Sequence, residues 1–369
     1  MRVVFDHSIF GLQPYGGVSR YFFEVTNHLA RMGNNVEIFS PLYVNEYFHD
    51  NCAVRPRGFR IGLKTRRLGR IVSAINTGAS LLFVKTRRHV DIFHETYFTT
   101  SDCCPGSAKR VLTVYDMIYE RYPRYFSPLD RTPQLKEHAV KRADHVICIS
   151  ENTRRDLIEL LGVPEEKTSV VYLGYSLDAN KAPSDPPRKG KPFILYVGSR
   201  WGYKNFDRMV KAYGSSKVLK DNLSLVCFGG GPFNSEEWAM FGSLQIPRDD
   251  VMHVSGNDDV LAGLYSSASL FVYPSLYEGF GIPPLEAMFF GCPVACANSS
   301  SLPEVVGEAA ELFDPNDEDS MRCAMERVIS EQARSRELVR SGKERIKLFS
   351  WEKCAADTLE VYRTVLGVR

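Results

Sequence analysis

The sequence predicts an α/β protein with two Rossmann-like domains, each built on a parallel sheet with helices on both faces. The chain has 369 residues, more than one hydrophobic core usually fills. Short apolar runs alternate with helical patterns along most of its length, an order typical of parallel sheets. A polar segment over 176–192, rich in Pro, Asp, Ser and Lys, separates two such series and is expected to be a linker. We therefore expect a first domain over 1–175, a second over 193–349, and a last helix over about 350–369 that could pack back on the first domain.

The first domain is expected to begin with the strand Arg2–Asp6, followed by a glycine-containing loop and a helix from Ser19 to about Arg31. Ser150 is of a residue type that caps helix N-termini, so another helix is expected directly after it. Other apolar runs predict further strands over Asn35–Ser40, Asp91–His94, Arg110–Tyr115, His145–Ser150 and Ser169–Leu173.

The second domain repeats the same alternation of strands and helices. Its strands are expected over Phe193–Gly198, Ser224–Gly229, Val251–Val254, Ser269–Tyr273 and Val294–Cys296. If the two domains face each other, the carboxyl ends of their strands would line a cleft. That is the usual ligand position in open α/β sheets.

The composition predicts a cytoplasmic globular protein. Hydrophobic residues make up 44% of the chain and charged residues 24%, ordinary values for a globular domain. We find no run of about 18 apolar residues, and a first strand that begins at Arg2 is expected to leave no signal peptide. The nine cysteines are scattered without metal-ligand spacing. We therefore expect reduced thiols and no metal site.

Residues 55–88 carry ten Lys or Arg and no Asp or Glu. Within this segment Leu68, Ile71, Val72 and Ile75 recur at helical spacing. Two interpretations stay open. A basic amphipathic helix suits an anionic membrane surface or a pyrophosphate-bearing acceptor, which would give a peripheral position at the inner face of the plasma membrane. An ordinary helix docked on a sheet can also have a basic outer face. Nucleic acid is not expected as a partner, because aromatic and groove-reading signatures are missing.

The segment Tyr277–Ala287 is the most informative part of the chain. It follows a short apolar run that Pro274 ends, and it contains two adjacent prolines of the kind found at the first positions of helices. It therefore predicts a turn that opens a helix, with Gly291 as the stop signal. Backbone amides at such a turn, together with the positive end of the helix dipole, suit phosphate or sugar oxygens.

Glu278 and Glu286 stand eight positions apart across this turn. A carboxylate on each side of an anion site can accept hydrogen bonds from vicinal hydroxyls of a sugar ring or a ribose. Either glutamate alone would be typical of a solvated surface acid, but the glycine-bracketed arrangement favours a ligand site. The amides expected to face the ligand are those of Phe280, Gly281 and Ile282.

Several further segments keep a fixed order along the chain. They are Tyr15–Tyr21, Val197–Arg200, Lys204-Asn205, Phe228–Gly231, Asp259–Tyr265, Glu278–Glu286 and Ser300–Val305. In order and spacing, and over nearly the whole chain, they resemble glycosyltransferase family 4. These enzymes are retaining transferases that use nucleotide sugars and have the GT-B fold of two Rossmann-like domains. Each segment alone is a weak to moderate signal, whereas the set is specific.

The resemblance implies roles for the charged residues in these segments. Arg200 and Lys204 would reach the donor diphosphate as paired cations and offset the charge of the leaving group. Glu286 would hold the ribose hydroxyls, and Glu278 the donor sugar near its reacting end. The plainer interpretation is that these cations lie on the surface of a loop and bind no ligand. It applies more readily to Lys204 alone than to Arg200 and Lys204 together.

Glycines complete the donor site that the resemblance implies. Gly16 and Gly17 would let the backbone of the first domain approach the pyrophosphate, where a side chain would clash. From the second domain, Gly198 and Gly279 join Phe280, Gly281 and Ile282 in the donor-binding set.

One departure from the family pattern concerns the end of the strand that here reads Tyr115-Asp116. Many relatives carry His-Asp there, and that His is expected to contact the donor sugar or the acceptor. Either the backbone carbonyl fills this role, or His94, which stands beside Glu95 at a neighbouring strand end, has taken it. A lone His in such a place is more often structural. Asp116 and Glu120 are the other acids near it.

Together these features predict transfer of a hexose or deoxyhexose from a GDP- or UDP-linked sugar to a glycan or polyprenyl-diphosphate-linked acceptor. The expected setting is bacterial surface polysaccharide synthesis, as lipopolysaccharide O-antigen or capsule. The resemblance implies retention of configuration, and the two cations imply that neither a metal nor another cofactor is needed. Alternatives are a nucleotide-sugar-binding protein without turnover and a sugar-nucleotide epimerase. A dinucleotide oxidoreductase is disfavoured, because no Gly-x-Gly-x-x-Gly follows the first strand.

Overall fold

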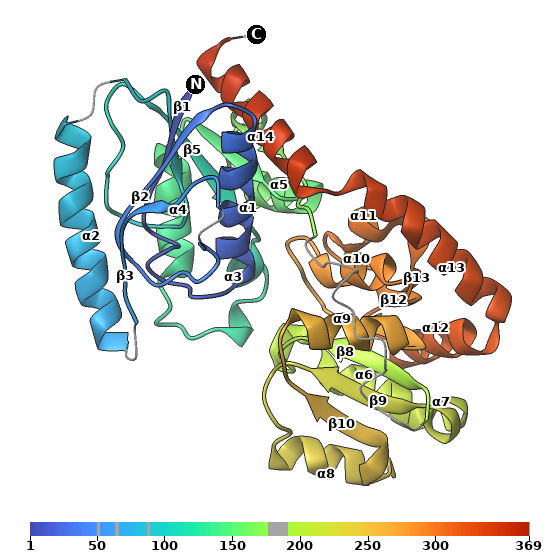
Figure 1. Cartoon of the computed structure of the whole chain (residues 1–369). Helices are drawn as coiled ribbons and strands as arrows, with labels where there is room; N and C mark the ends of the chain where they lie inside the picture. The colour runs from blue at the N-terminus through green and yellow to red at the C-terminus, as the bar shows by residue number, and fades with distance from the viewer. Residues whose placement is uncertain (50–51, 63–65, 87–88, 176–190, 369) are drawn as a thin grey trace. The chain divides into compact units, whose positions relative to one another are not determined.

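The computed structural model of the chain describes residues 1–49, 52–62, 66–86, 89–175 and 191–368. Its contacts divide the chain into two compact units, Met1–Gly174 with Trp351–Arg369 and Tyr175–Ser350. Most of the predicted linker, residues 176–190, lies outside the described residues. Each unit has a parallel sheet with helices packed on it (Figure 1), which confirms the predicted fold class of two Rossmann-like domains.

In the described part of the first unit the sheet has seven strands, in the order β3-β2-β1-β4-β5-β6-β7. The strands are β1 (Arg2–Phe5), β2 (Asn35–Tyr43), β3 (Pro56–Arg60), β4 (Ile92–Glu95), β5 (Lys109–Val114), β6 (His145–Cys148) and β7 (Thr168–Val170). The helices are α1 (Gly17–Arg31), α2 (Arg66–Thr86), α3 (Ile118–Arg121), α4 (Thr132–Arg142), α5 (Glu151–Leu161) and α14 (Trp351–Leu366). Ser150 caps α5 as predicted, because its Oγ accepts a hydrogen bond of 3.0 Å from the Thr153 amide.

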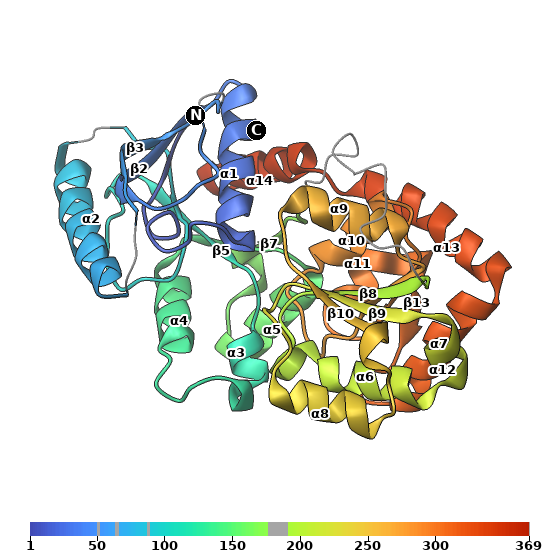
Figure 2. The same cartoon turned by 60° about the horizontal axis from the view of Figure 1, so that its bottom comes forward.

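Helices cover both faces of this sheet. α1 and α14 pack side by side, and α2 lies on the other side of the strands from α1 in both views (Figures 1 and 2). The core between α1 and the sheet is aromatic. Phe22 of α1 makes edge contacts with Phe5 of β1 and His94 of β4, at centroid distances of 5.8 and 5.2 Å.

The described residues of the second unit form a six-stranded sheet in the order β10-β9-β8-β11-β12-β13. The strands are β8 (Phe193–Val197), β9 (Ser224–Phe228), β10 (Val251–Val254), β11 (Leu270–Tyr273), β12 (Val294–Ala297) and β13 (Glu311–Phe313). The helices are α6 (Phe206–Ser215), α7 (Lys217–Asn222), α8 (Ser235–Ser243), α9 (Asp258–Ser267), α10 (Ile282–Phe289), α11 (Leu302–Val306), α12 (Glu318–Ser330) and α13 (Gln332–Arg345). β8 and β11 are central neighbours, and the chain order reverses between them, which marks a topological switch point.

The sequence did not predict the edge strands β3 and β13. β3 reads Pro-Arg-Gly-Phe-Arg, in which only Pro56 is buried, so it lacks the apolar run that marks the central strands. β13 has three residues and gives almost no periodic signal.

Helix α2 forms as predicted, but its apolar stripe is divided between two faces. Val72 is buried, whereas Ile71 and Ile75 are 56% and 49% exposed. The face toward the sheet is instead partly polar: Asn76 accepts a hydrogen bond from the Leu42 amide and donates one to the Leu42 carbonyl, both of 2.8 Å. The side chain of Leu68 lies outside the described residues. Among the described helices, α2 included, none is both long enough and apolar enough to cross a membrane.

Candidate functional site

The turn between β11 and α10 has the geometry that the sequence predicts. Gly281 adopts a φ of 112°, and α10 begins directly after it with proline in its first turn. A Cβ on Gly281 would lie 2.7 Å from Leu302 Cδ2, so glycine is required here for space as well as for conformation. The turn therefore presents the N-terminus of α10 at the carboxyl end of a central strand.

Two serines that sequence reasoning missed fix this turn. Ser300 Oγ accepts a hydrogen bond of 2.9 Å from the Glu278 amide. Ser301 Oγ lies 2.9 Å from the Glu278 carbonyl oxygen and 2.8 Å from that of Phe280. Because both serines follow β12, they tie the turn to the next strand of the sheet. The Ser300-Ser301 pair was noticed only as part of the family resemblance, and nothing local in the sequence indicates that it holds the turn.

Lys204 and Glu278 come together in this structure. Lys204 Nζ lies 2.7 Å from Glu278 Oε1, and both side chains are mostly buried. Tyr273 of β11 also forms a hydrogen bond with Glu278, and burial together with this carboxylate raises the pKa of the Tyr273 hydroxyl well above its usual value. Glu278 is thereby held between a cation and a phenol at the start of the turn. Such a carboxylate has accepting positions left for a ligand hydroxyl.

Glu286 lies on α10 and is buried, with 8% of its surface exposed. The Tyr265 hydroxyl donates to Glu286 Oε2 over 3.3 Å, which orients the carboxylate from α9. Burial raises the pKa of Tyr265 well above its usual value, with Glu286 adding to the effect, so the phenol stays a donor. Glu286 and Glu278 thus lie on the same turn–helix segment, each oriented by a buried tyrosine.

Arg200 has a different environment from the one that the sequence suggested. Its Nε lies 2.6 Å from Glu237 Oε1, and its other nitrogens donate to the carbonyls of Gly229 and Gly231, each over 2.9 Å. The guanidinium also lies 4.6 Å from the centre of the Phe233 ring. These contacts hold Arg200 against the glycine turn after β9, whereas Lys204 pairs with Glu278. That Arg200 contacts the donor diphosphate stays a prediction.

The glycines around Arg200 lie in the two turns that follow β8 and β9. Gly229, Gly230 and Gly231 all have positive φ, of 86°, 73° and 76°. A Cβ on Gly230 would lie 3.0 Å from Arg200 Nη1. Gly198, at the end of β8, has a φ of 133° and donates its amide hydrogen to the Phe228 carbonyl over 2.9 Å.

The remaining predicted residues belong to the first unit. Gly16 precedes α1 and Gly17 begins it. The Gly16 amide lies 3.4 Å from the Tyr47 hydroxyl, and a Cβ on Gly16 would clash with Gln13 Oε1 at 2.5 Å. A Cβ on Gly17 would meet no atom within 4 Å. A side chain at Gly16 would require Gln13 to move, whereas the local contacts at Gly17 leave space for one.

His94 is fully buried in the core of the first unit, so its ring does not face a cleft as the alternative role for it required. Its Nε2 lies 2.9 Å from Thr113 Oγ1, and its Nδ1 forms a short hydrogen bond with the hydroxyl of Tyr362 on α14. Burial lowers the pKa of His94 to about 3, which keeps the ring neutral. Its place under α1 and α14 makes it a structural residue.

The side chain of Tyr115 also points inward. Its hydroxyl donates to the Thr96 carbonyl over 3.1 Å, and burial raises its pKa well above the usual value. Asp116 is different, because its side chain is 36% exposed and lies 3.9 Å from Lys136 Nζ. The Lys136 ammonium also donates to the Asp116 carbonyl oxygen over 2.8 Å. Asp116 is thus more exposed than Glu120, whose side chain is 12% exposed and lies 2.9 Å from Lys136 Nζ.

Comparisons with known proteins identify the family of the chain. A model described as Glycosyltransferase Family 4 matches residues 15–179, and one described as Glycosyl transferases group 1 matches residues 178–345. The O-antigen chain mannosyltransferase B of Escherichia coli is 28% identical over 69% of this chain and 70% of its own length. The O-antigen chain mannosyltransferase RfbU of Salmonella typhimurium is 32% identical over 62% of this chain and 64% of its own length.

A solved structure extends the likeness to the whole fold. HepE of Anabaena, crystallised with UDP, aligns over 99% of this chain and 100% of its own, with a TM-score of 0.72 and 17% sequence identity. At that identity the likeness concerns the fold alone. With the two family models covering residues 15–345, the chain belongs to glycosyltransferase family 4 and has its GT-B fold of two Rossmann-like domains.

Proposed function

We propose that this glycosyltransferase transfers a hexose from a nucleoside diphosphate sugar to a glycan acceptor in surface polysaccharide assembly. The hexose that we propose is mannose. The sugar is suggested by the two O-antigen mannosyltransferases that are 28% and 32% identical. The base is guanine or uracil. The observation that carries the proposal is the Lys204–Glu278 pair of 2.7 Å beside the N-terminus of α10.

The proposed chemistry needs a fixed positive charge at the departing diphosphate. Lys204 and the N-terminal amides of α10 would supply it, while Glu278 accepts a hydrogen bond from a hydroxyl of the donor sugar. The bond from the anomeric carbon to the phosphate oxygen breaks, and the acceptor oxygen bonds to the same face of that carbon. The configuration is retained because bond formation and departure occur on the same face, and the acceptor proton passes to the leaving phosphate oxygen. No metal enters this scheme, because the diphosphate charge is balanced by Lys204 and the helix.

Glu286 would hold the nucleoside end of the donor. A buried carboxylate that Tyr265 orients can accept both hydroxyl hydrogens of a ribose. Because Glu286 is buried, two such hydrogen bonds would contribute more binding free energy than the same bonds at an exposed carboxylate.

The segment 55–88 would hold the enzyme at an anionic bilayer, where a polyprenyl-diphosphate-linked acceptor is anchored. The described outer face of α2 exposes Ile71, Ile75 and Leu82, the last by 67%, within a segment of ten basic and no acidic residues. Co-sedimentation with phosphatidylglycerol vesicles at low salt should fall when Ile71 and Ile75 are changed to Ser. Leu129→Ser is the control and should bind like wild type, because Leu129 lies in the loop before α4 and is 89% exposed, more than Ile71 or Ile75. Equal binding of all three proteins would overturn the assignment.

The direct test is transfer by the purified protein. GDP-mannose and the common UDP-hexoses are offered with a polyprenyl-diphosphate-linked oligosaccharide, with and without excess chelator, and the product's anomeric configuration is read by NMR. An axial mannoside formed at an undiminished rate in chelator supports the proposal. An inverted product, or loss of turnover that a divalent ion restores, contradicts the scheme.

One observation favours a second candidate, a nucleotide-sugar-binding protein without turnover. The position where many relatives carry a histidine is Tyr115, whose side chain is buried and bonded to the backbone. Donor binding without transfer to any acceptor, and without slow hydrolysis of the donor, would favour this alternative.

A further inference from the structure

A pocket of about 220 Å³ opens in the first unit between α2, the loop after β1 and the segment after β4. We call it the α2 pocket. Its lining residues are His7, Ser8, Gly11, Leu12, Gly69, Val72, Ser73, Asn76, Phe98, Thr99, Thr100 and Leu135. β1 and β4 are paired neighbours in the sheet, and the pocket lies beyond their carboxyl ends. That is where open α/β sheets bind their ligands.

His7 is the buried polar group of this pocket, with 6% of its surface exposed. Its Nδ1 lies 3.1 Å from Ser80 Oγ on α2, and among the described residues its recorded hydrogen bonds involve that nitrogen alone. Burial lowers the pKa of His7, against the opposing effect of Asp6, so the ring is neutral. A neutral imidazole anchored at Nδ1 has one further hydrogen bond to give or accept, at Nε2.

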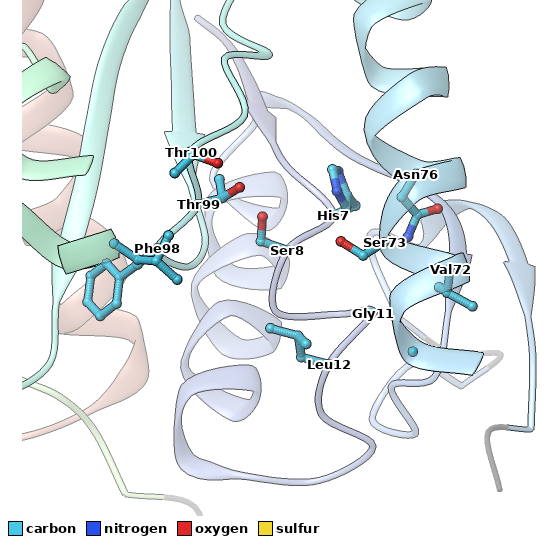
Figure 3. A pocket seen from close by; sticks show the side chains of 12 residues that line it. His7, Ser8, Gly11, Leu12, Val72, Ser73, Asn76, Phe98, Thr99 and Thr100 are labelled. Atoms are coloured by element: carbon cyan, nitrogen blue, oxygen red, sulfur yellow. The ribbon is translucent and has the colours of Figure 1, made fainter. Parts of the chain in front are cut away.

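The rest of the lining combines hydroxyl groups with apolar surface. Ser73 projects from α2 toward the loop that carries Ser8, and Thr99 and Thr100 lie across from them (Figure 3). Leu12, Val72, Phe98 and Leu135 supply the apolar part. None of these described lining residues is Lys, Arg, Asp or Glu. A neutral described lining of this kind suits a ring with hydroxyls on its edge and carbon–hydrogen faces.

The loop runs close to α2 at Gly11. The Gly11 amide donates to the His7 carbonyl over 3.0 Å, and a Cβ on Gly11 would make an ordinary contact of 3.4 Å with Asn76 Nδ2. Ser8 Oγ donates to Asp6, 2.6 Å away, and the Asp6 carboxylate in turn accepts from the Thr96 amide over 2.7 Å. The pocket wall is therefore preorganised by bonds between β1, β4 and α2, a property of built ligand sites.

We propose that the α2 pocket binds one neutral sugar ring of the acceptor, with His7 Nε2 and the surrounding hydroxyls bonding to its hydroxyls. This inference rests on the proposed transfer to a glycan. The volume of about 220 Å³ is below the roughly 300–1,000 Å³ of pockets for drug-sized ligands, which fits a single ring rather than an oligosaccharide. The same loop continues to Gly16 and Gly17, so one segment of the first unit carries the pocket and the glycines predicted to approach the donor.

The pocket is tested by filling it. Ser73→Phe places an aromatic ring into the pocket from α2, whereas Ala74→Phe adds the same ring at the next, exposed position outside the lining. Binding of methyl α-D-mannopyranoside is followed by saturation-transfer NMR on the full chain, and binding of GDP and UDP by calorimetry. We expect Ser73→Phe to weaken sugar binding at least about tenfold, Ala74→Phe to leave it unchanged, and both to bind nucleotide like wild type. Equal sugar binding by the two variants would overturn the inference.

Two substitutions of His7 test the assigned nitrogen. His7→Asn keeps a polar atom near the Nδ1 position and loses the one near Nε2, whereas His7→Gln does the reverse. Sugar binding should fall further in His7→Asn than in His7→Gln, and the reverse order would contradict the role of Nε2. Inorganic phosphate is the competitor: if it displaces the methyl mannoside, the pocket is an anion site and the inference fails.

These outcomes separate the pocket from the proposed function. If Ser73→Phe raises the acceptor KM without changing the donor KM, both stand. If transfer by Ser73→Phe equals that of wild type, the pocket inference fails and the function remains. If wild type transfers nothing yet binds the mannoside through Ser73 and His7, the pocket stands and the proposed function fails.

Discussion

Lys204 and Glu278 form an ion pair of 2.7 Å that joins the turn after β8 to the turn that opens α10. The Lys204 ammonium also lies 5.6 Å from the centre of the Tyr273 ring, and Tyr273 bonds to Glu278. The cation and the carboxylate are thereby fixed on one side of the helix terminus. A donor that brings a diphosphate and a sugar hydroxyl can engage both groups without reorganising them.

Lys204→Ala should lower kcat/KM by about 10²–10³, the effect of removing one group that stabilises developing negative charge. Lys204→Arg should recover part of this loss, because it keeps the charge. The matched control is Lys211→Ala, at a half-exposed lysine of α6 that lies 3.8 Å from Glu318. Steady-state kinetics with a saturating acceptor measure the effect, and equal losses in Lys204→Ala and Lys211→Ala would remove Lys204 from the site.

Glu286→Gln should weaken binding of the bare nucleoside diphosphate by about tenfold, because the amide accepts only one of the two ribose hydrogens well. Tyr265→Phe removes the hydroxyl that orients Glu286 and should have a smaller effect in the same direction. Calorimetry with GDP and UDP gives both values. An unchanged affinity in Glu286→Gln would show that the ribose lies elsewhere.

Arg200→Ala should act mainly on stability. Removing one partner of a buried ion pair costs about 3–5 kcal/mol, and the Arg200 and Glu237 side chains are 5% and 10% exposed. The double variant Arg200→Leu with Glu237→Leu should regain part of that loss, because no charge is left uncompensated. Urea unfolding of the variants measures these differences. A fully stable Arg200→Ala protein that has lost turnover would instead support the direct role at the donor diphosphate that the sequence predicts.

Stability should fall in acid because His94 is buried as a neutral ring. The folded pKa is about 3 and the ordinary value is 6.5, so the unfolded chain binds more protons between these values. Stability is therefore lost as the pH falls below 6.5, by at most about 1.4 kcal/mol per pH unit from this group. The free energy of unfolding is measured with urea at about pH 8 and at about pH 5. His94→Asn should reduce the difference between the two values by up to about 2 kcal/mol. His138→Gln, at an exposed position on α4, should leave it unchanged. If His94→Asn keeps the whole wild-type difference in unfolding free energy between the two pH values, His94 is not the group responsible.

The local sequence predicts the parts of the site that are built from neighbours in the chain. The turn with Gly281, the prolines after it and the two glutamates all lie within one short segment, so residue type and spacing indicate their geometry. The central strands were predictable for the same reason, because each is a continuous buried run.

Long-range partners could not be predicted. Arg200 was expected to contact the donor diphosphate, and nothing near it in the sequence indicates its ion pair with Glu237, 37 positions away. His94 was one of two candidates for a ligand contact, and nothing near it indicates Tyr362, which bonds to it and follows 268 positions later on α14. In both cases the partners come from distant parts of the chain, so residue type and local spacing do not reveal them.

The proposed transfer requires a nucleotide sugar bound at the turn before α10. The most direct measurement is a crystal structure of the chain with the nucleoside diphosphate sugar that stabilises it most in a thermal-shift screen. We predict a diphosphate oxygen within hydrogen-bonding distance of Lys204 Nζ, a sugar hydroxyl at Glu278 and the ribose at Glu286. A ligand seated elsewhere, with the Lys204–Glu278 turn in contact with solvent alone, would contradict the account.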